Sequence, residues 1–148
     1  MQPSDGNARQ QARREIEEMF GFVPKFYDAV PEALRASGWG IQRDLELAET
    51  TLDSKTKELI GLAVAAHIKC RYCIHFHTEA ARAFGASDTE MREAVAMGGL
   101  TVMFSNMLTG AQTDLEQFKS EANRAMKHLM SKAGSGGNTV RRAPPPRA

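Results

Sequence analysis

One stretch of this sequence, residues 59–68, constrains the fold more than any other. It reads LIGLAVAAHI, follows Glu58, and would be apolar on nearly every face if it formed a helix. A helix of that kind is buried on all sides. A small domain can hardly enclose it alone, so we expect a partner subunit to cover one side. A simple core helix in a monomer is the alternative.

The remaining segments also have helical periodicity, and none alternates polar and apolar residues over the length of a useful strand. We therefore predict an all-α, single-domain bundle of about six helices. Their ends are predicted from a candidate N-cap at Ser54, a capping box over residues 87–90 and several glycine stops. The expected helices cover residues 9–20, a segment that begins at Pro31 and contains Leu34, Ile41, Leu45 and Leu47, then about 55–69, Cys70 to Gly85, Ser87 to Gly98–Gly99, and Thr101 to Leu129.

Both ends of the chain are predicted to be disordered. Residues 1–8 are polar and include a proline and a glycine, and residues 133–148 are rich in Gly, Ser, Pro and Arg. Such compositions are typical of flexible or extended tails. The helical domain is therefore expected over residues 9–132.

Composition narrows the function further. The formal net charge is +1, which gives no reason to expect nucleic acid or an anionic membrane as a partner. No apolar run reaches the roughly 18 residues of a membrane span, and the N-terminus lacks the apolar core of a secretory signal. We therefore expect a cytoplasmic protein. Two cysteines in that compartment suggest redox chemistry or metal binding rather than a structural disulfide.

The two cysteines share a helix face with a histidine in the sequence CRYCIHFH, residues 70–77. At about 100° per residue, Cys70, Cys73 and His77 fall within roughly 60° of one another. The Cys-x-x-Cys spacing allows the two sulfurs to bond, and a helix N-terminus favours the thiolate. His77 follows Cys73 by four residues and is therefore placed to take its proton.

Glu58 joins this group through the expected packing of two helices. If the chain turns near Lys69, an antiparallel hairpin brings Glu58 beside the turn that begins at His77, and Gly61 and Ala65 allow the helices to approach closely. A carboxylate at the edge of an apolar helix is costly unless it is paired, and His77 is a ready partner, directly or through one water. We expect Glu58 to orient and charge His77, which then activates a thiol.

Other interpretations of these residues are possible. Two cysteines with one or two histidines could hold zinc, with His75 or His67 completing the set. His75 lies about 160° around the helix from His77, and His67 about 180° from Glu58, so a closed tetrahedral site is awkward. Glu58 could also be an acid that only favours the helix dipole. We expect no metal and no other cofactor.

The segment from Lys57 to Ser87 resembles the AhpD-like alkylhydroperoxidases of the carboxymuconolactone decarboxylase superfamily. The marker is Glu, eleven residues, Cys-x-x-Cys, three residues and His, and it matches at Glu58, Cys70, Cys73 and His77. The resemblance implies an all-α fold, a homo-oligomer such as a trimer or hexamer, and thiol-dependent reduction of hydroperoxides without a cofactor.

The resemblance also implies the roles of the two cysteines. Cys73 would attack the peroxide and Cys70 would resolve the sulfenic acid, whereas the helix dipole alone favours Cys70 as the nucleophile. The implied reductant is a dithiol carrier, such as a lipoylated protein. Tyr72 stands where the best-known members have a histidine. The decarboxylase branch lacks the cysteine pair, which argues against lactone decarboxylation here.

Two other functions are carried as alternatives to the peroxidase. One is a disulfide oxidoreductase that acts on a non-peroxide partner. The other is a zinc-binding or purely structural oligomeric module.

Overall fold

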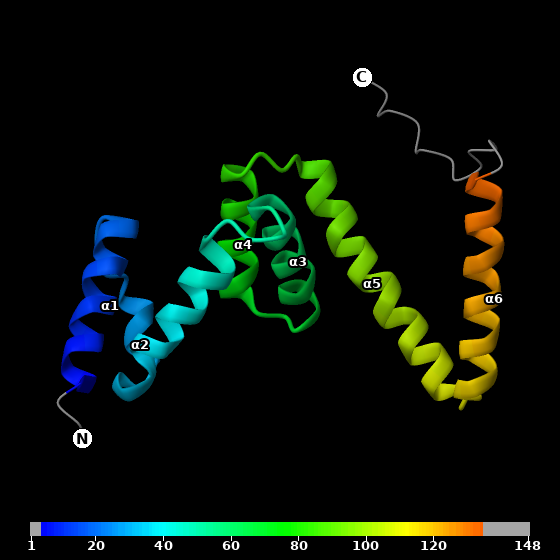
Figure 1. The fold of residues 1–148 in the computed structure, drawn as a ribbon, viewed down its shortest axis with the longest axis horizontal. Helices are drawn as coiled ribbons and strands as arrows, with labels where there is room; N and C mark the ends of the chain where they lie inside the picture. The colour runs from blue at the N-terminus through cyan, green and yellow to red at the C-terminus, as the bar shows by residue number, and fades with distance from the viewer. Residues whose placement is uncertain (1–3, 135–148) are drawn as a thin grey trace. The chain divides into compact units, whose positions relative to one another are not determined.

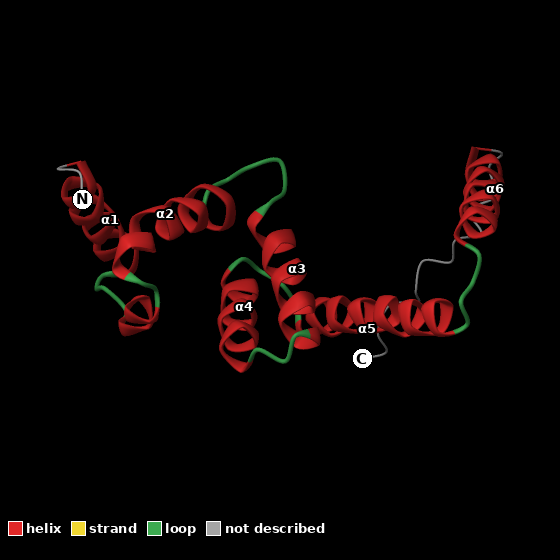
Figure 2. Ribbon diagram, turned by 90° about the horizontal axis from the view of Figure 1, so that it is seen from below, coloured by secondary structure: helices red, strands yellow, loops and turns green. Residues whose placement is uncertain are grey.

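The computed structural model describes residues 4–134, and within them the chain is helical with no strand (Figures 1 and 2). This confirms the predicted all-α class and the expectation of about six α-helices for the described part of the chain. No helix within those residues combines the length and the apolar composition needed to cross a bilayer. In chain order the elements are α1 (Ser4–Phe20), the 3₁₀ helix η1 (Lys25–Ala29), α2 (Glu32–Ile41), the π-helix η2 (Gln42–Leu47), α3 (Ser54–His67), α4 (Arg71–Ala83), α5 (Asp88–Gly110) and α6 (Leu115–Gly134).

The chain divides into two compact units, and the boundary between Leu100 and Thr101 lies within α5. Residues up to Leu100 form the unit that contains every residue of the predicted site. Two apolar clusters stabilise this unit, one built from α1, η1 and α2 and the other from α3, α4 and the start of α5.

The first cluster is centred on Trp39, of which only 1% is exposed. Ala12, Ile16 and Tyr27 complete its buried part, and the indole packs edge-on against the rings of Phe20 and Tyr27. A buried indole needs a partner for its N–H. The Trp39 Nε1 donates to Glu15 Oε2 at 2.7 Å, and the same oxygen accepts from Arg43 Nη1 at 2.7 Å. This cluster therefore holds α1 against α2 and the start of η2.

The second cluster forms around the pair of helices α3 and α4, which pack side by side (Figure 1). Its buried members are Leu62, Ala81, Ala86 and Met91. The chain reverses at Lys69, which has the left-handed φ of 57°. This tight reversal is the antiparallel hairpin that the sequence predicts, and it decides which residues of α3 face α4.

The observed helix ends differ from several predicted ends. The N-cap of α3 is Asp53, which accepts from Thr56 N at 2.8 Å, so the prediction of Ser54 is wrong by one residue. Helix α1 begins at Ser4, inside the tail expected over residues 1–8, because the polar residues that suggested a tail also tolerate a helix. Helix α6 includes residues 133 and 134, and the rest of the predicted C-terminal tail lies outside the described residues.

The largest correction concerns α5, which continues through Gly98 and Gly99 to Gly110. Adjacent glycines lower helix propensity but do not prevent a helix. Here a side chain of another helix occupies the space beside one of the glycines. A Cβ at Gly98 would lie 2.7 Å from the His67 ring, which shows that the glycine serves close packing instead of ending the helix.

The chain breaks later instead, at Gln112, whose φ is 52°. Asp114 then caps the next helix by accepting from Gln117 N at 2.6 Å. The expected helix over Thr101 to Leu129 is therefore wrong. Its residues are divided between the end of α5 and α6.

Candidate active site

The two cysteines lie at the N-terminus of α4 and form a disulfide with each other. Cys70 is the N-cap, with extended backbone, and its Sγ accepts from Cys73 N at 3.3 Å. Their Cα atoms are 5.3 Å apart, and both residues are half-buried. The predicted Cys-x-x-Cys geometry is therefore present: the spacing places both sulfurs within one helical turn, at the positive end of the helix dipole.

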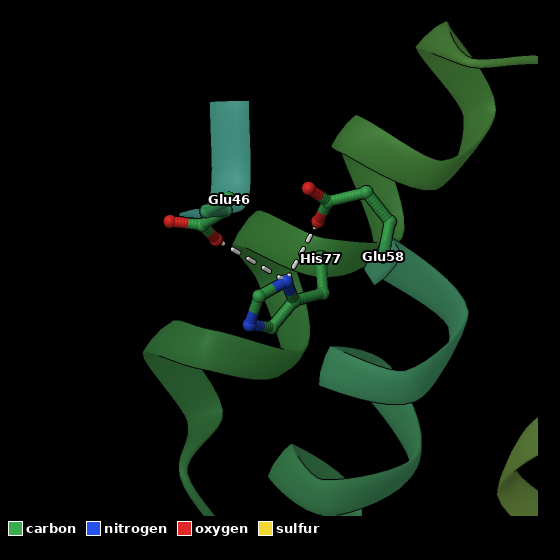
Figure 3. A group of neighbouring side chains, drawn as sticks. All are labelled: Glu46, Glu58 and His77. Atoms are coloured by element: carbon green, nitrogen blue, oxygen red, sulfur yellow. Dashed lines mark hydrogen bonds and ion pairs between the residues drawn. The ribbon is translucent and has the colours of Figure 1, made fainter. Parts of the chain in front are cut away.

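Glu58 and His77 meet between α3 and α4, as the hairpin argument predicts. His77 Nδ1 lies 2.7 Å from Glu58 Oε2, and only 1% of the Glu58 surface is exposed (Figure 3). A buried carboxylate is costly unless a donor or a positive group pairs with it. The direct hydrogen bond fixes the imidazole with Nδ1 toward the carboxylate and leaves Nε2 for another partner.

Gly61 makes this contact possible. A Cβ at residue 61 would lie 2.5 Å from His77 Cε1 and 2.6 Å from Nδ1, closer than real side chains pack. The imidazole therefore occupies the space that any other residue at position 61 would fill. The small residue that was expected to allow helix approach also determines where the histidine ring lies.

A second carboxylate, Glu46, faces the same nitrogen and was not predicted. Its Oε1 lies 3.8 Å from His77 Nδ1, and it reaches the site from η2 (Figure 3). The π-helical hydrogen bond from Ala48 N to Arg43 O closes this element. Single π turns occur often at functional sites. The sequence alone does not distinguish Glu46 from nearby Glu49, because both are acids in an ordinary charged segment.

Glu46 also influences the first apolar cluster. Burial, and secondarily the negative charge of Glu46, raise the pKa of Tyr27 to about 12. Tyr27 thus stays protonated and donates its hydroxyl to Gln42 Oε1 at 2.6 Å. Glu46 is therefore near both the packed N-terminal cluster and the Glu58–His77 pair.

The donor atoms of Glu46, Glu58 and His77 all lie within 4.8 Å of one another, which would suit a metal ion. Neither cysteine belongs to this group, unlike in the zinc alternative considered from the sequence. His67, a candidate ligand in that alternative, bonds through Nδ1 to Ala63 O at 2.7 Å and packs against Gly98. His75 is exposed.

The comparisons with known proteins concern the fold and the family of the chain. The crystal structure of an alkylhydroperoxidase AhpD core from Rhodospirillum rubrum is similar, with a TM-score of 0.64 and 29% sequence identity over 76% of this chain and 86% of that one. This likeness confirms the AhpD-like fold.

Two curated relatives are uncharacterised. One is uncharacterised protein 4 in the cox locus of Paracoccus denitrificans, 42% identical over 48 residues, which are 32% of this chain and 43% of the relative. The other is an uncharacterised protein of Haemophilus influenzae, 37% identical over 66 residues, which are 45% of this chain and 54% of the relative. The chain thus spans about half the length of the curated relatives it matches. The sequence pattern of the carboxymuconolactone decarboxylase family matches residues 24–112, so this chain belongs to that family and to its AhpD-like members.

Proposed function

We propose that this protein is a thiol-dependent peroxidase that reduces hydroperoxides. The observation that carries the proposal is the disulfide of Cys70 and Cys73 at the start of α4, on the same helical hairpin that brings Glu58 and His77 together. A reversible dithiol and an oriented base are the two components that a thiol peroxidase needs. Membership of the AhpD-like group supports the same function.

The proposed reaction begins with the reduced protein. His77, oriented by Glu58, accepts the proton of the Cys73 thiol. The thiolate attacks one oxygen of the peroxide, the O–O bond breaks, and the alcohol leaves with the proton that His77 returns. The sulfur of Cys73 is oxidised to a sulfenic acid while the peroxide is reduced.

The second half of the cycle regenerates the thiols. Cys70 attacks the sulfenic acid, a disulfide forms and water leaves. A dithiol reductant then reduces this disulfide by exchange and is itself oxidised to a disulfide. Lipoyl groups on a carrier protein have the required chemistry. We place this cycle in the cytoplasm, where reducing partners keep dithiols available.

The reaction is tested by measuring peroxide consumption with several dithiol donors, dihydrolipoamide among them. Wild type should consume peroxide, and Cys73→Ser should not. When Cys70→Ser is treated with peroxide in the absence of any added dithiol, the sulfenic acid should accumulate, because no thiol remains to resolve it. A Cys73→Ser protein that still forms sulfenic acid at the wild-type rate would reverse the assigned roles. Repeated turnover of the dithiol with a disulfide substrate supplied in place of peroxide would favour disulfide exchange with another partner instead.

We also propose that the working form is a homo-oligomer, a trimer or hexamer. Within one chain, α3 buries Glu58, Leu62 and Ala65 but leaves another face exposed. That face carries Ile60, Val64 and Ile68, which are 50%, 54% and 66% exposed. Contiguous apolar surface of this kind is typical of an interface between subunits.

A further inference from the structure

We propose that Glu46, Glu58 and His77 form a binding site for a divalent transition-metal cation such as Zn²⁺ or Mn²⁺. The three residues come from η2, α3 and α4, and their side chains turn toward one another (Figure 3). The donor atoms lie within 4.8 Å of one another. The site is distinct from any that uses the cysteines.

The donor set has the chemistry that such ions prefer. Imidazole nitrogen suits zinc and other transition metals, and carboxylate oxygen suits zinc and manganese. Bonds of about 2.0–2.2 Å to one ion place neighbouring donors about 3.0–3.6 Å apart. The observed separations from His77 Nδ1 are 2.7 Å to Glu58 and 3.8 Å to Glu46, which lie on either side of that range. Small side-chain shifts would therefore bring all three onto one ion.

An independent observation also indicates a ligand. Glu58 Oε1 is buried and has no hydrogen-bond partner among the described residues. A buried carboxylate oxygen without a donor is unfavourable, because the oxygen has lost its hydration and gained no partner in exchange. The Oε2 atom is satisfied by His77, so one oxygen of a nearly inaccessible carboxylate has spare capacity. A cation held between Glu58 and Glu46 would compensate that charge.

The site is accessible to an ion and is held in place. The side chains of His77 and Glu46 are 19% and 23% exposed, so solvent can reach the group from that side. The imidazole packs directly against Gly61, and Glu58 lies on α3 where that helix packs against α4. Three protein ligands leave at least one coordination position for water, as in open metal sites.

Binding would have a consequence for the chemistry, and this one step depends on the proposed function. A cation on Nδ1 replaces the Glu58–His77 hydrogen bond and leaves the ring proton on Nε2. The imidazole can then no longer accept the proton of Cys73. Cation binding and proton transfer exclude each other, so the cation would act as a reversible inhibitor.

The test uses the full-length protein in its oxidised form, because the Cys70–Cys73 disulfide leaves no thiolate to bind metal. Zn²⁺ and, separately, Mn²⁺ are titrated by calorimetry. We expect one ion per chain and at least a tenfold weaker affinity in Glu46→Gln. Glu49→Gln, an exposed acid three residues along the chain, is the matched control and should bind as wild type does.

A second measurement keeps the test valid if Glu46→Gln folds poorly. In the wild-type oxidised protein, Zn²⁺ should shift the imidazole resonances of His77 while leaving those of His67 unchanged. The absence of binding, equal affinity in wild type and Glu46→Gln, or an unshifted His77 would each overturn the proposal. Because peroxide is absent throughout, these outcomes are independent of whether the protein is a peroxidase.

Discussion

The imidazole of His77 lies against the α-carbon of Gly61, so closely that a methyl group there would come within 2.5 Å of the ring. This contact couples a backbone position on α3 to the orientation of a side chain on α4. The ring is the movable partner, because it is the end of a side chain, whereas the helix backbone is not.

Gly61→Ala should therefore leave the fold intact and impair the site. The added methyl group displaces the His77 ring from Glu58, and a misplacement of about 1 Å can reduce a catalytic rate by roughly 100-fold. We expect a loss of that order in peroxide reduction with little change in the far-UV circular dichroism. Gly98→Ala is the matched control, because its Cβ would lie 2.7 Å from the His67 ring, outside the site. Equal losses in both variants would mean that helix packing, and not ring position, is responsible.

Glu58 and His77 should behave as one functional unit. Glu58→Gln and His77→Ala should each slow peroxide reduction by about 10²–10⁴-fold, the usual contribution of a general base. The double variant should be little slower than the slower single one, because residues that act together are not additive.

The thiol itself provides a second measurement of this unit. In a Cys70→Ser background, the rate of Cys73 alkylation should depend on both residues near neutral pH, and the differences should shrink above the ordinary thiol pKa of about 8.5. An unchanged thiol pKa in both single variants would refute the proton transfer. Fully additive losses would instead show that the two residues act separately.

Acid should weaken the contact between α3 and α5 through Glu90. Lys55 Nζ bonds to Glu90 Oε1 at 2.8 Å, and Ser87 donates to the other carboxylate oxygen. These hydrogen bonds, that from Lys55 first, lower the pKa of Glu90 to about 2. A depressed carboxyl pKa adds stability that is fully present above the unfolded value near 4.5 and is lost as the pH falls toward 2.

Glu90→Gln should therefore melt at a lower temperature than wild type at pH 7, and the difference should disappear between pH 4.5 and about 2. Glutamine can still accept the capping hydrogen bond from Ser87, so the variant removes the charged contact with Lys55 and keeps the cap. Glu93→Gln, an exposed acid on the same helix, serves as the control. A difference from wild type that is constant over this pH range would assign the effect to packing.

Association should be visible in the mass of the protein in solution. Light scattering at micromolar concentration should give three or six times the chain mass of 16.3 kDa. Val64→Lys places a charge in the exposed apolar face of α3 and should shift the protein toward the monomer. Ala83→Lys, at an exposed position in the last turn of α4, should not. A wild-type mass of about 16 kDa would refute the oligomer.

The contact between Glu58 and His77 could be predicted because it depends on local quantities. The turn near Lys69 and the rise per residue determine which turns of the two consecutive helices lie level with each other. The small residue at position 61 allows the helices to approach closely there. The pairing of Glu58 with His77 then follows from the cost of burying an unpaired carboxylate. None of these arguments requires knowledge of distant segments.

Glu46 could not be predicted in this way. Its position depends on a π-helical turn and on how η2 packs against α3, and neither leaves a periodic signal in the sequence. The predicted boundary between the fifth and sixth helices was wrong for a different reason. Glycine ends helices, but it also permits close packing inside them, and only the position of His67 shows which applies at Gly98.

The two faces of α3 have different roles in the protein. Glu58 and Gly61 are on the side that holds the histidine, while Ile60, Val64 and Ile68 remain uncovered on another. A neighbouring subunit that packs onto the exposed face would restrict the bending and rotation of the whole helix α3. Specific activity would then fall on dilution, at concentrations where subunits separate, before any loss of helix content. The turnover rate per chain would thus depend on the concentration of the protein.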